Sequence, residues 1–372
     1  MIDPISDTLS NAVRAVAARE GCEIDADALT AVLGVAWSAV AVPSEPDIGN
    51  WCLYARDAFL VEAGRLFGLE IRGIHPPEAA RGLSGAAEFV QHFDASYRPL
   101  IHRALEHGQP VLAWQGWPGA LCLAWGVITD PCHDGVGFRG TIHVSPGDTE
   151  MDAMTVTLIS PPVQLYVVET VTPTRIDPNE CTTLALDHAR RVLDNALADR
   201  FDVFTGPAAF DVWIERLGGA GEADHNGCHG QLAASAGPAD VPKGTGAQAA
   251  RGTPQNDGET VSAGDFGSQR DLPASHLYLT KSLIRGYESV IRFLQSATAA
   301  ASNADESTFA ALAGKCHDVV TAFRETAFTQ VGADANSAPD PEAIFAALRQ
   351  AKAATEDLQR ILTRQPSDSP TR

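Results

Sequence analysis

The chain has 372 residues, a formal net charge of −20 at pH 7 and a hydrophobic fraction of 45%. This length suffices for two domains of ordinary size, and the hydrophobic fraction is that of a globular protein. Nucleic acids and anionic membrane surfaces attract clustered Lys and Arg, so we expect a chain this acidic, without such a cluster, to bind neither.

The cysteine pattern and the N-terminal residues indicate the cellular compartment in which the protein is expected. The seven cysteines are widely scattered and form no C-x-x-C pair of the kind that builds a zinc site. The N-terminus lacks the basic and apolar regions of a secretory signal, and no apolar run approaches the roughly 20 residues of a membrane-spanning helix. We therefore expect a cytoplasmic protein with reduced thiols, and neither a metal nor a cofactor.

Helical spacing of apolar residues dominates the first hundred positions. It predicts helices over 8–19 and 25–33, followed by a short strand or buried turn over 34–42. Asn50 is suited to cap a helix that ends at Gly68. A further amphipathic helix is expected over 89–106.

The period then changes from helical to extended. Short apolar segments separated by Gly or Pro predict strands at Val111–Trp114, Cys122–Thr129, Phe138–Val144, Met154–Ile159 and Gln164–Glu169. Such a series is typical of an antiparallel sheet. Helices first and strands second is the order of an α+β fold, because parallel sheets alternate strands with helices.

The most conspicuous of these segments is GQPVLAWQGWPGALCLAWGVITD, Gly108–Asp130. Two apolar segments flank the turn-forming residues Trp117, Pro118 and Gly119. The pattern predicts a hairpin that is either buried core or the floor of a site. Tryptophans that could line such a pocket are Trp51, Trp114, Trp117 and Trp125, although tryptophan is more often a core residue.

Helical spacing returns over 182–197 and 206–217. Residues 218–272 lose periodicity and fill with Gly, Ala, Ser, Asp and Pro, which indicates a disordered insert. Three strong helical segments follow, over 276–295, 306–330 and 341–364, and predict a helical bundle. The expected organisation is an α+β domain over 1–217, the insert, a helical domain over 273–364, and a tail over 365–372.

The order of several motifs resembles a known family. SEPDIGNWCLYARDAFLVEAGRLFGLEIRGI, then GQPVLAWQGW, LAWGVITD, F-R-G and QLYVVE are similar to the N-terminal domain of the butirosin biosynthesis protein H family. That family is similar in turn to bacteriocin leader peptidases, which have a papain-like fold. GPAAFDVWIERL and the long helices resemble the downstream region, so the likeness covers roughly Thr8–Gln330 apart from the insert. The resemblance implies a papain-like α+β domain.

Papain-like catalysis needs a cysteine at a helix N-terminus and a histidine on the facing sheet. In the alignment that the resemblance implies, the nucleophile position falls at Thr8 or next to it, and the histidine position at Ala124 or its neighbour. The following strand, around 141–145, lacks the Asp-Pro pair that orients the ring in the peptidases. The resemblance therefore predicts the fold without the chemistry, with a Thr8 nucleophile as a remaining alternative.

Other constellations leave further alternatives open. Cys52 with His133 or His143 would be a rearranged catalytic dyad, unless Cys52 is simply a small buried apolar residue. In Cys132-His133-Asp134, neighbouring side chains point in different directions and cannot form a relay.

Two clusters of ligand-like residues have simpler explanations. The segment DHNGCHGQL holds His225, Cys228 and His229, which are too few for a structural zinc site. The acids Asp47, Asp57 and Glu62 could attract a cationic substrate such as an aminoglycoside, but surface acids are ordinary on so acidic a chain.

The sequence thus predicts a non-catalytic papain-like-fold protein that binds a small molecule or peptide, in the context of natural-product biosynthesis. One alternative is an acyltransferase or amidohydrolase that uses Cys52. Another is an assembly factor in which the C-terminal helices contact a protein partner or a second copy.

Overall fold

An antiparallel sheet with helices on both faces organises the part of the chain that the computed structural model describes. The described residues are 8–37, 39–41, 57–74, 86–118, 121, 124–132, 137–144, 152–195, 204–223, 272–300, 303–324 and 341–364. Within them, no helix is long and apolar enough to cross a membrane. Mixed helices and antiparallel strands confirm the α+β class.

The sheet has six strands in the order β2-β7-β3-β4-β5-β6, and all neighbouring strands are antiparallel. They are β2 (Leu69–Gly73), β3 (Val111–Trp114), β4 (Trp125–Pro131), β5 (Phe138–Val144), β6 (Asp152–Thr157) and β7 (Gln164–Val171). A separate two-stranded sheet joins β1 (Val40–Ala41) to β8 (Phe204–Thr205). The predicted hairpin is the antiparallel pair β3–β4.

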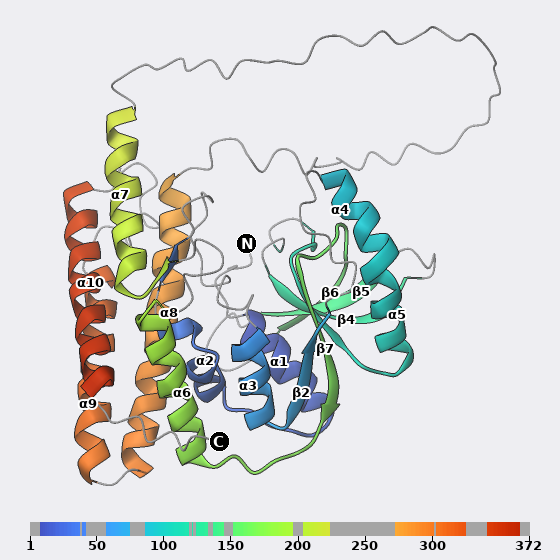
Figure 1. The fold of residues 1–372 in the computed structure, drawn as a ribbon, viewed down its shortest axis with the longest axis horizontal. Helices are drawn as coiled ribbons and strands as arrows, with labels where there is room; N and C mark the ends of the chain where they lie inside the picture. Colours follow the sequence, from blue (N-terminus) through green and yellow to red (C-terminus); the bar gives the residue numbers. More distant parts are fainter. Residues whose placement is uncertain are drawn as a thin grey trace, which may run out of the picture.

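Side-chain alternation along the strands divides the core into two clusters. On β3, Leu112 and Trp114 belong to one cluster, whereas Val111 and Ala113 belong to the other. The first cluster contains residues of α1 (Thr8–Arg19), α2 (Ala26–Val32), α3 (Asp57–Leu66) and α6 (Pro178–Leu193). The second contains Phe93 and residues of α5 (Arg98–Glu106), which follows α4 (Ala86–His92) on the opposite side of the sheet (Figure 1).

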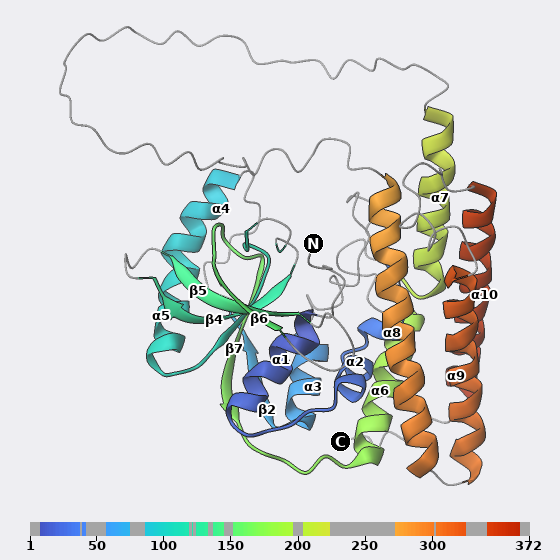
Figure 2. The same cartoon turned by 180° about the vertical axis from the view of Figure 1, so that it is seen from behind.

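Four further helices stand beside α6 on the far side of α1–α3, as Figures 1 and 2 show from opposite directions. They are α7 (Pro207–Ala223), α8 (Leu272–Ala300), α9 (Asn303–Arg324) and α10 (Pro341–Arg364). Buried residues of α8, α9 and α10 belong to the same core cluster as those of α1 and α2. The helical bundle is therefore packed onto the α+β part through one shared core.

Helix α8 makes the closest of these contacts, against the 3₁₀ turn Val35–Trp37. A Cβ atom built on Gly286 would lie 3.1 Å from Ala36 Cα, so the two backbones approach closely. The Tyr287 hydroxyl donates a 2.8 Å hydrogen bond to the Trp37 carbonyl. Burial of this hydroxyl raises the pKa of Tyr287, so the group stays a neutral donor.

The structure corrects one predicted helix and adds a strand that was not predicted. The helix expected over 89–106 begins at Ala86 and is interrupted by a π-helical turn, Phe93–Tyr97, in which the Arg98 N–H donates to the Phe93 carbonyl. Pro99 has no N–H for an ordinary helical bond, which accounts for the change of register. Strand β2 was not predicted, because Leu69–Gly73 is too short to stand out between a helix and a turn. Residues 224–271 lie outside the described residues.

Candidate functional site at the N-terminus of α1

The first residue of α1 meets the first residue of β4. Thr8 is only 8% exposed, and its Oγ1 accepts a 2.9 Å hydrogen bond from the backbone N–H of Trp125, 117 positions along the chain. The resemblance assigned the nucleophile position to Thr8 and the histidine position to Ala124 or its neighbour. The fold brings these two positions into direct contact.

This contact stands where the pairing of β4 with β5 ends. The register stops at Val127 opposite Thr141, and two further positions would set Trp125 opposite His143. Instead the Trp125 N–H donates to Thr8, and the His143 carbonyl accepts a 3.4 Å hydrogen bond from Asn11 Nδ2. Two side chains from the first turn of α1 thus replace a pair of backbone hydrogen bonds, and hold the helix end between the two strands.

His143 contributes a ring to the same region. Because Ile142 and Val144 point into the opposite core cluster, alternation places the His143 side chain on the face that carries α1. Its Nε2 is buried and has no hydrogen-bond partner within the described part of the chain. Burial lowers the pKa of His143, and the positive charge of Arg19 lowers it further, so the ring is neutral at pH 7.

Two tryptophans and a glutamine lie side by side on neighbouring strands, next to the contact between Thr8 and Trp125. Trp114 pairs with Trp125 on one side and with Gln164 on the other, and both indoles belong to the core cluster that contains α1. Gln164 alternates with Leu165, which faces the other cluster, so its side chain also lies on the α1 face. Gln164 Oε1 is buried without a hydrogen-bond partner among the residues described. Buried polar atoms without partners are rare in native proteins, so both Gln164 Oε1 and His143 Nε2 have unused capacity for a ligand.

The lowered pKa of His143 predicts a dependence of stability on pH. Protonation of this ring is easier in the unfolded chain, so its contribution is fully present above the unfolded pKa of about 6.5 and is lost as the pH falls through the lower folded value. The free energy of unfolding of His143→Asn, measured by urea denaturation, should therefore decline less than that of the wild type on acidification below about pH 6.5. Parallel pH profiles for the two proteins would contradict this.

The remaining candidates from the sequence do not join this group. Trp117 belongs to the opposite core cluster, beneath α5, and is therefore separated from Trp114 and Trp125 by the sheet itself. Outside the described residues are Trp51, Cys52, Asp47, His133, Asp134, His225, Cys228 and His229. In the described part of the chain, no group of three or more His, Cys, Asp or Glu side chains could hold a metal ion.

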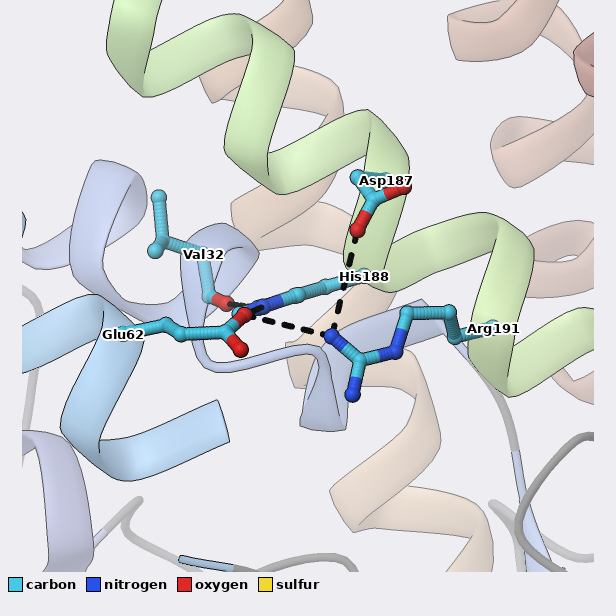
Figure 3. Close-up of polar contacts among 5 residues, drawn as sticks. All are labelled: Val32, Glu62, Asp187, His188 and Arg191. Atoms are coloured by element: carbon cyan, nitrogen blue, oxygen red, sulfur yellow. Dashed lines mark hydrogen bonds and ion pairs between the residues drawn. The ribbon is translucent and has the colours of Figure 1, made fainter. Parts of the chain in front are cut away.

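A buried histidine that the sequence did not single out lies on α6. His188 is fully buried; its Nδ1 contacts the Val32 carbonyl at 2.5 Å, and its Nε2 contacts Glu62 Oε2 at 2.8 Å (Figure 3). Arg191 Nη1 donates to the same Glu62 oxygen at 3.2 Å. Each ring nitrogen of His188 therefore faces an oxygen from a different helix. The Glu62 carboxylate is thus engaged by two groups of α6, which weakens its case as an attractor of a cationic substrate.

The surroundings of His188 indicate a structural role. Its ring packs edge-on against Phe59 at a centroid distance of 4.3 Å, and the Arg191 guanidinium lies 4.5 Å from the centre of the same Phe59 ring. These contacts join α2, α3 and α6. The signal was present in the sequence, because His188 follows the helical spacing of the buried residues Cys181 and Ala185.

The described thiols are expected to differ in reactivity. Burial and, to a smaller extent, the charge of Asp25 raise the pKa of Cys181 to about 11, and burial raises the pKa of Cys316. Cys132 is partly exposed. Iodoacetamide at pH 7.5 should therefore modify Cys132 well before Cys181 or Cys316, as mapped by peptide mass spectrometry. Equal rates in the folded protein would count against the packing described here.

No protein-family model matches this chain, and no curated protein matches it significantly.

Proposed function

We propose that the protein is a non-catalytic member of the butirosin-protein-H and leader-peptidase-like group with a papain-like fold. In this proposal it binds a small molecule or peptide where its relatives do chemistry, in the context of natural-product biosynthesis. The observation that carries the proposal is the hydrogen bond between Thr8 Oγ1 and the Trp125 N–H. It supports the alignment, because two positions chosen from motif order alone are in contact.

The same bond speaks against catalysis. A nucleophile needs access to substrate and a base that takes its proton. The Thr8 side chain is nearly buried, and its oxygen satisfies a backbone N–H at the open end of the sheet. Trp125, in the place of the histidine, carries no group that titrates near neutral pH.

His143 does not supply the missing base. Its ring makes no hydrogen bond to the Thr8 hydroxyl in the described part of the chain, and Nε2 has no partner at all there. What links His143 to α1 is its backbone carbonyl, through Asn11. The His143 imidazole is thus free to contact a ligand, whereas the His143 backbone carbonyl binds α1 through Asn11.

The proposal of binding is supported by the side chains that lie beside the N-terminus of α1 on the sheet. Trp114 and Trp125 are each only 2% exposed and supply an apolar wall beside these groups, while Gln164 Oε1 and His143 Nε2 offer hydrogen-bonding positions that the described residues leave unused. An apolar floor with a few polar groups is typical of sites for small molecules and peptides.

The absence of acyl transfer can be tested with an activated ester. We expect p-nitrophenyl acetate to leave no acetyl group on Thr8 or Cys52, as judged by intact-mass and peptide analysis. Thr8→Val keeps the side-chain shape, and Cys52→Ser removes the thiol. An acetyl adduct that disappears in Thr8→Val would overturn the non-catalytic assignment, and one that disappears in Cys52→Ser would favour the cysteine-dependent enzyme.

Binding is tested by thermal shift with a panel of natural-product intermediates and peptides. A ligand of the proposed site raises Tm, and Gln164→Leu or His143→Asn reduces that rise. Val90→Ala, at an exposed position of α4, is the matched control. A ligand whose effect survives both site substitutions would place binding elsewhere.

A further inference from the structure

Strand β6 forms one edge of the six-stranded sheet and pairs only with β5 in the described chain. Leu158 N–H bonds to the Phe138 carbonyl, so the backbone groups of Leu158 and of every second residue before it point toward β5. The N–H and C=O groups of Ala153, Thr155 and Thr157 therefore point away from the sheet. None of these three residues has a further hydrogen bond within the described chain.

This edge carries little of the usual protection. Natural edge strands carry charged residues or prolines, or are covered, because open backbone groups recruit other strands. The first residue of β6, Asp152, is charged and exposed, but residues 153–163 read AMTVTLISPPV without a charged residue, in a chain of which 20% is charged, and the prolines come only after the strand. The side chains of Ala153, Thr155 and Thr157 are exposed.

Exposed apolar side chains lie directly after the strand. Ile159 is 68% exposed and Val163 is 55% exposed, and the remaining large exposed hydrophobic residue in the described chain, Val90, lies on α4. Backbone bonds hold this segment in place: Ile159 N–H donates to the Gly116 carbonyl, and Val163 N–H to the Trp114 carbonyl. These bonds direct residues 159–163 toward the end of β3 and the start of β7, so Ile159 is the exposed apolar residue next to the edge.

We propose that β6 is a dimer interface, at which a second copy of this chain pairs antiparallel about a two-fold axis through Thr155. Thr155 then faces its own copy, and Ala153 faces Thr157, so each of these residues donates and accepts one backbone hydrogen bond. Neutral β-branched residues meet at the centre, which favours cross-strand pairing.

Charge selects the second copy as the occupant. With a net charge of −20, most contacts between copies bring acidic surfaces together. The segment 153–163 is uncharged throughout, so two copies can pair there without placing like charges opposite one another. Residues 153–157 carry no charge that would select a basic or acidic foreign peptide. This inference is independent of the proposed function, because β6 has no residue in the site at α1.

The two-fold axis makes a sharp experiment possible. Sedimentation equilibrium of the full-length chain is expected to show a reversible dimer. Thr155→Lys and Thr155→Glu each place like charges opposite themselves and should weaken association roughly fivefold or more. An equimolar mixture of the two variants should restore the dimer, because Lys then faces Glu. Thr155→Val, neutral and β-branched, should dimerise as the wild type does.

Two controls separate pairing from folding. Val90→Lys adds the same charge at another exposed apolar position and should leave the dimer intact. Circular dichroism and Tm should show that every variant is folded. A wild-type chain that stays monomeric, a dimer that Thr155→Lys does not weaken, or variants that fail to recover on mixing would overturn the proposal. So would a monomer whose β6 edge binds an unrelated extended peptide.

Discussion

Trp117→Ala is expected to lower the free energy of unfolding by about 3–5 kcal/mol, the usual cost of removing a large buried aromatic side chain. Trp117 is 1% exposed, and its Nε1 donates a 3.4 Å hydrogen bond to the Ala113 carbonyl. Its indole covers two glycines on neighbouring strands: a Cβ atom on Gly126 would lie 2.5 Å from Cζ2, and one on Gly140 would lie 2.7 Å from Cη2. The substitution therefore opens a cavity across β4 and β5.

Urea denaturation measures this loss, and a double-mutant cycle tests its cause. Gly126→Ala should destabilise the wild type by about 1–3 kcal/mol through overpacking, but much less in the Trp117→Ala background, where the clashing ring is gone. Val90→Ala, on the exposed surface of α4, should change little. If the costs of Trp117→Ala and Gly126→Ala simply add, the two side chains do not compete for the same space.

His188→Leu is expected to cost about 2–4 kcal/mol, although the two side chains differ little in volume. The Val32 carbonyl loses its donor inside the core, and a buried acceptor without a partner costs about 1–3 kcal/mol. Glu62 loses one of two partners, but its side chain is 40% exposed, so water replaces part of that contact. Loss of the edge-on contact with Phe59 adds to the cost.

Asp187→Asn is the matched control for His188→Leu. Asp187 is the preceding residue on α6, and its 3.8 Å ion pair with Arg191 lies at the surface, so its loss should cost less than about 0.5 kcal/mol. Urea denaturation of the two variants should separate them clearly. A His188→Leu variant as stable as Asp187→Asn would show that the contacts of His188 with α2 and α3 do not stabilise the fold.

The hairpin Gly108–Asp130 shows how far sequence patterns reach. The short apolar segment Val111–Trp114 correctly predicts a strand, and the turn residues correctly predict its antiparallel partner. Neither pattern could predict which face of the sheet each tryptophan occupies. Trp114 and Trp125 belong to the core cluster beside α1, and Trp117 belongs to the opposite cluster. Trp117 lies beyond the end of β3, where strand alternation no longer applies, so only the packing over Gly126 and Gly140 places it.

The residues of the candidate site could likewise be predicted from the sequence only in part. Motif order led to Thr8 or a residue next to it and to Ala124 or its neighbour, but positions along the chain do not give the distance between them in space. Gln164 was overlooked because an isolated glutamine on a strand carries no distinctive local pattern. The helical spacing of His188 with Cys181 and Ala185 indicates burial, but it does not identify the partners of the ring. The partners of these two residues, or the lack of partners, arise from elements far away in the sequence.

By itself, the sequence determined most of the local structure: helices where apolar residues recur at helical spacing, strands where short apolar segments stand between Gly or Pro, and an α+β order of the two. These follow from interactions between residues a few positions apart. Only the tertiary structure decided that α1 begins against β4, that α8–α10 share a core with α1 and α2, and that β6 is an edge with open backbone groups. Each depends on which distant surfaces pack together, and that choice is made by the burial of the whole chain.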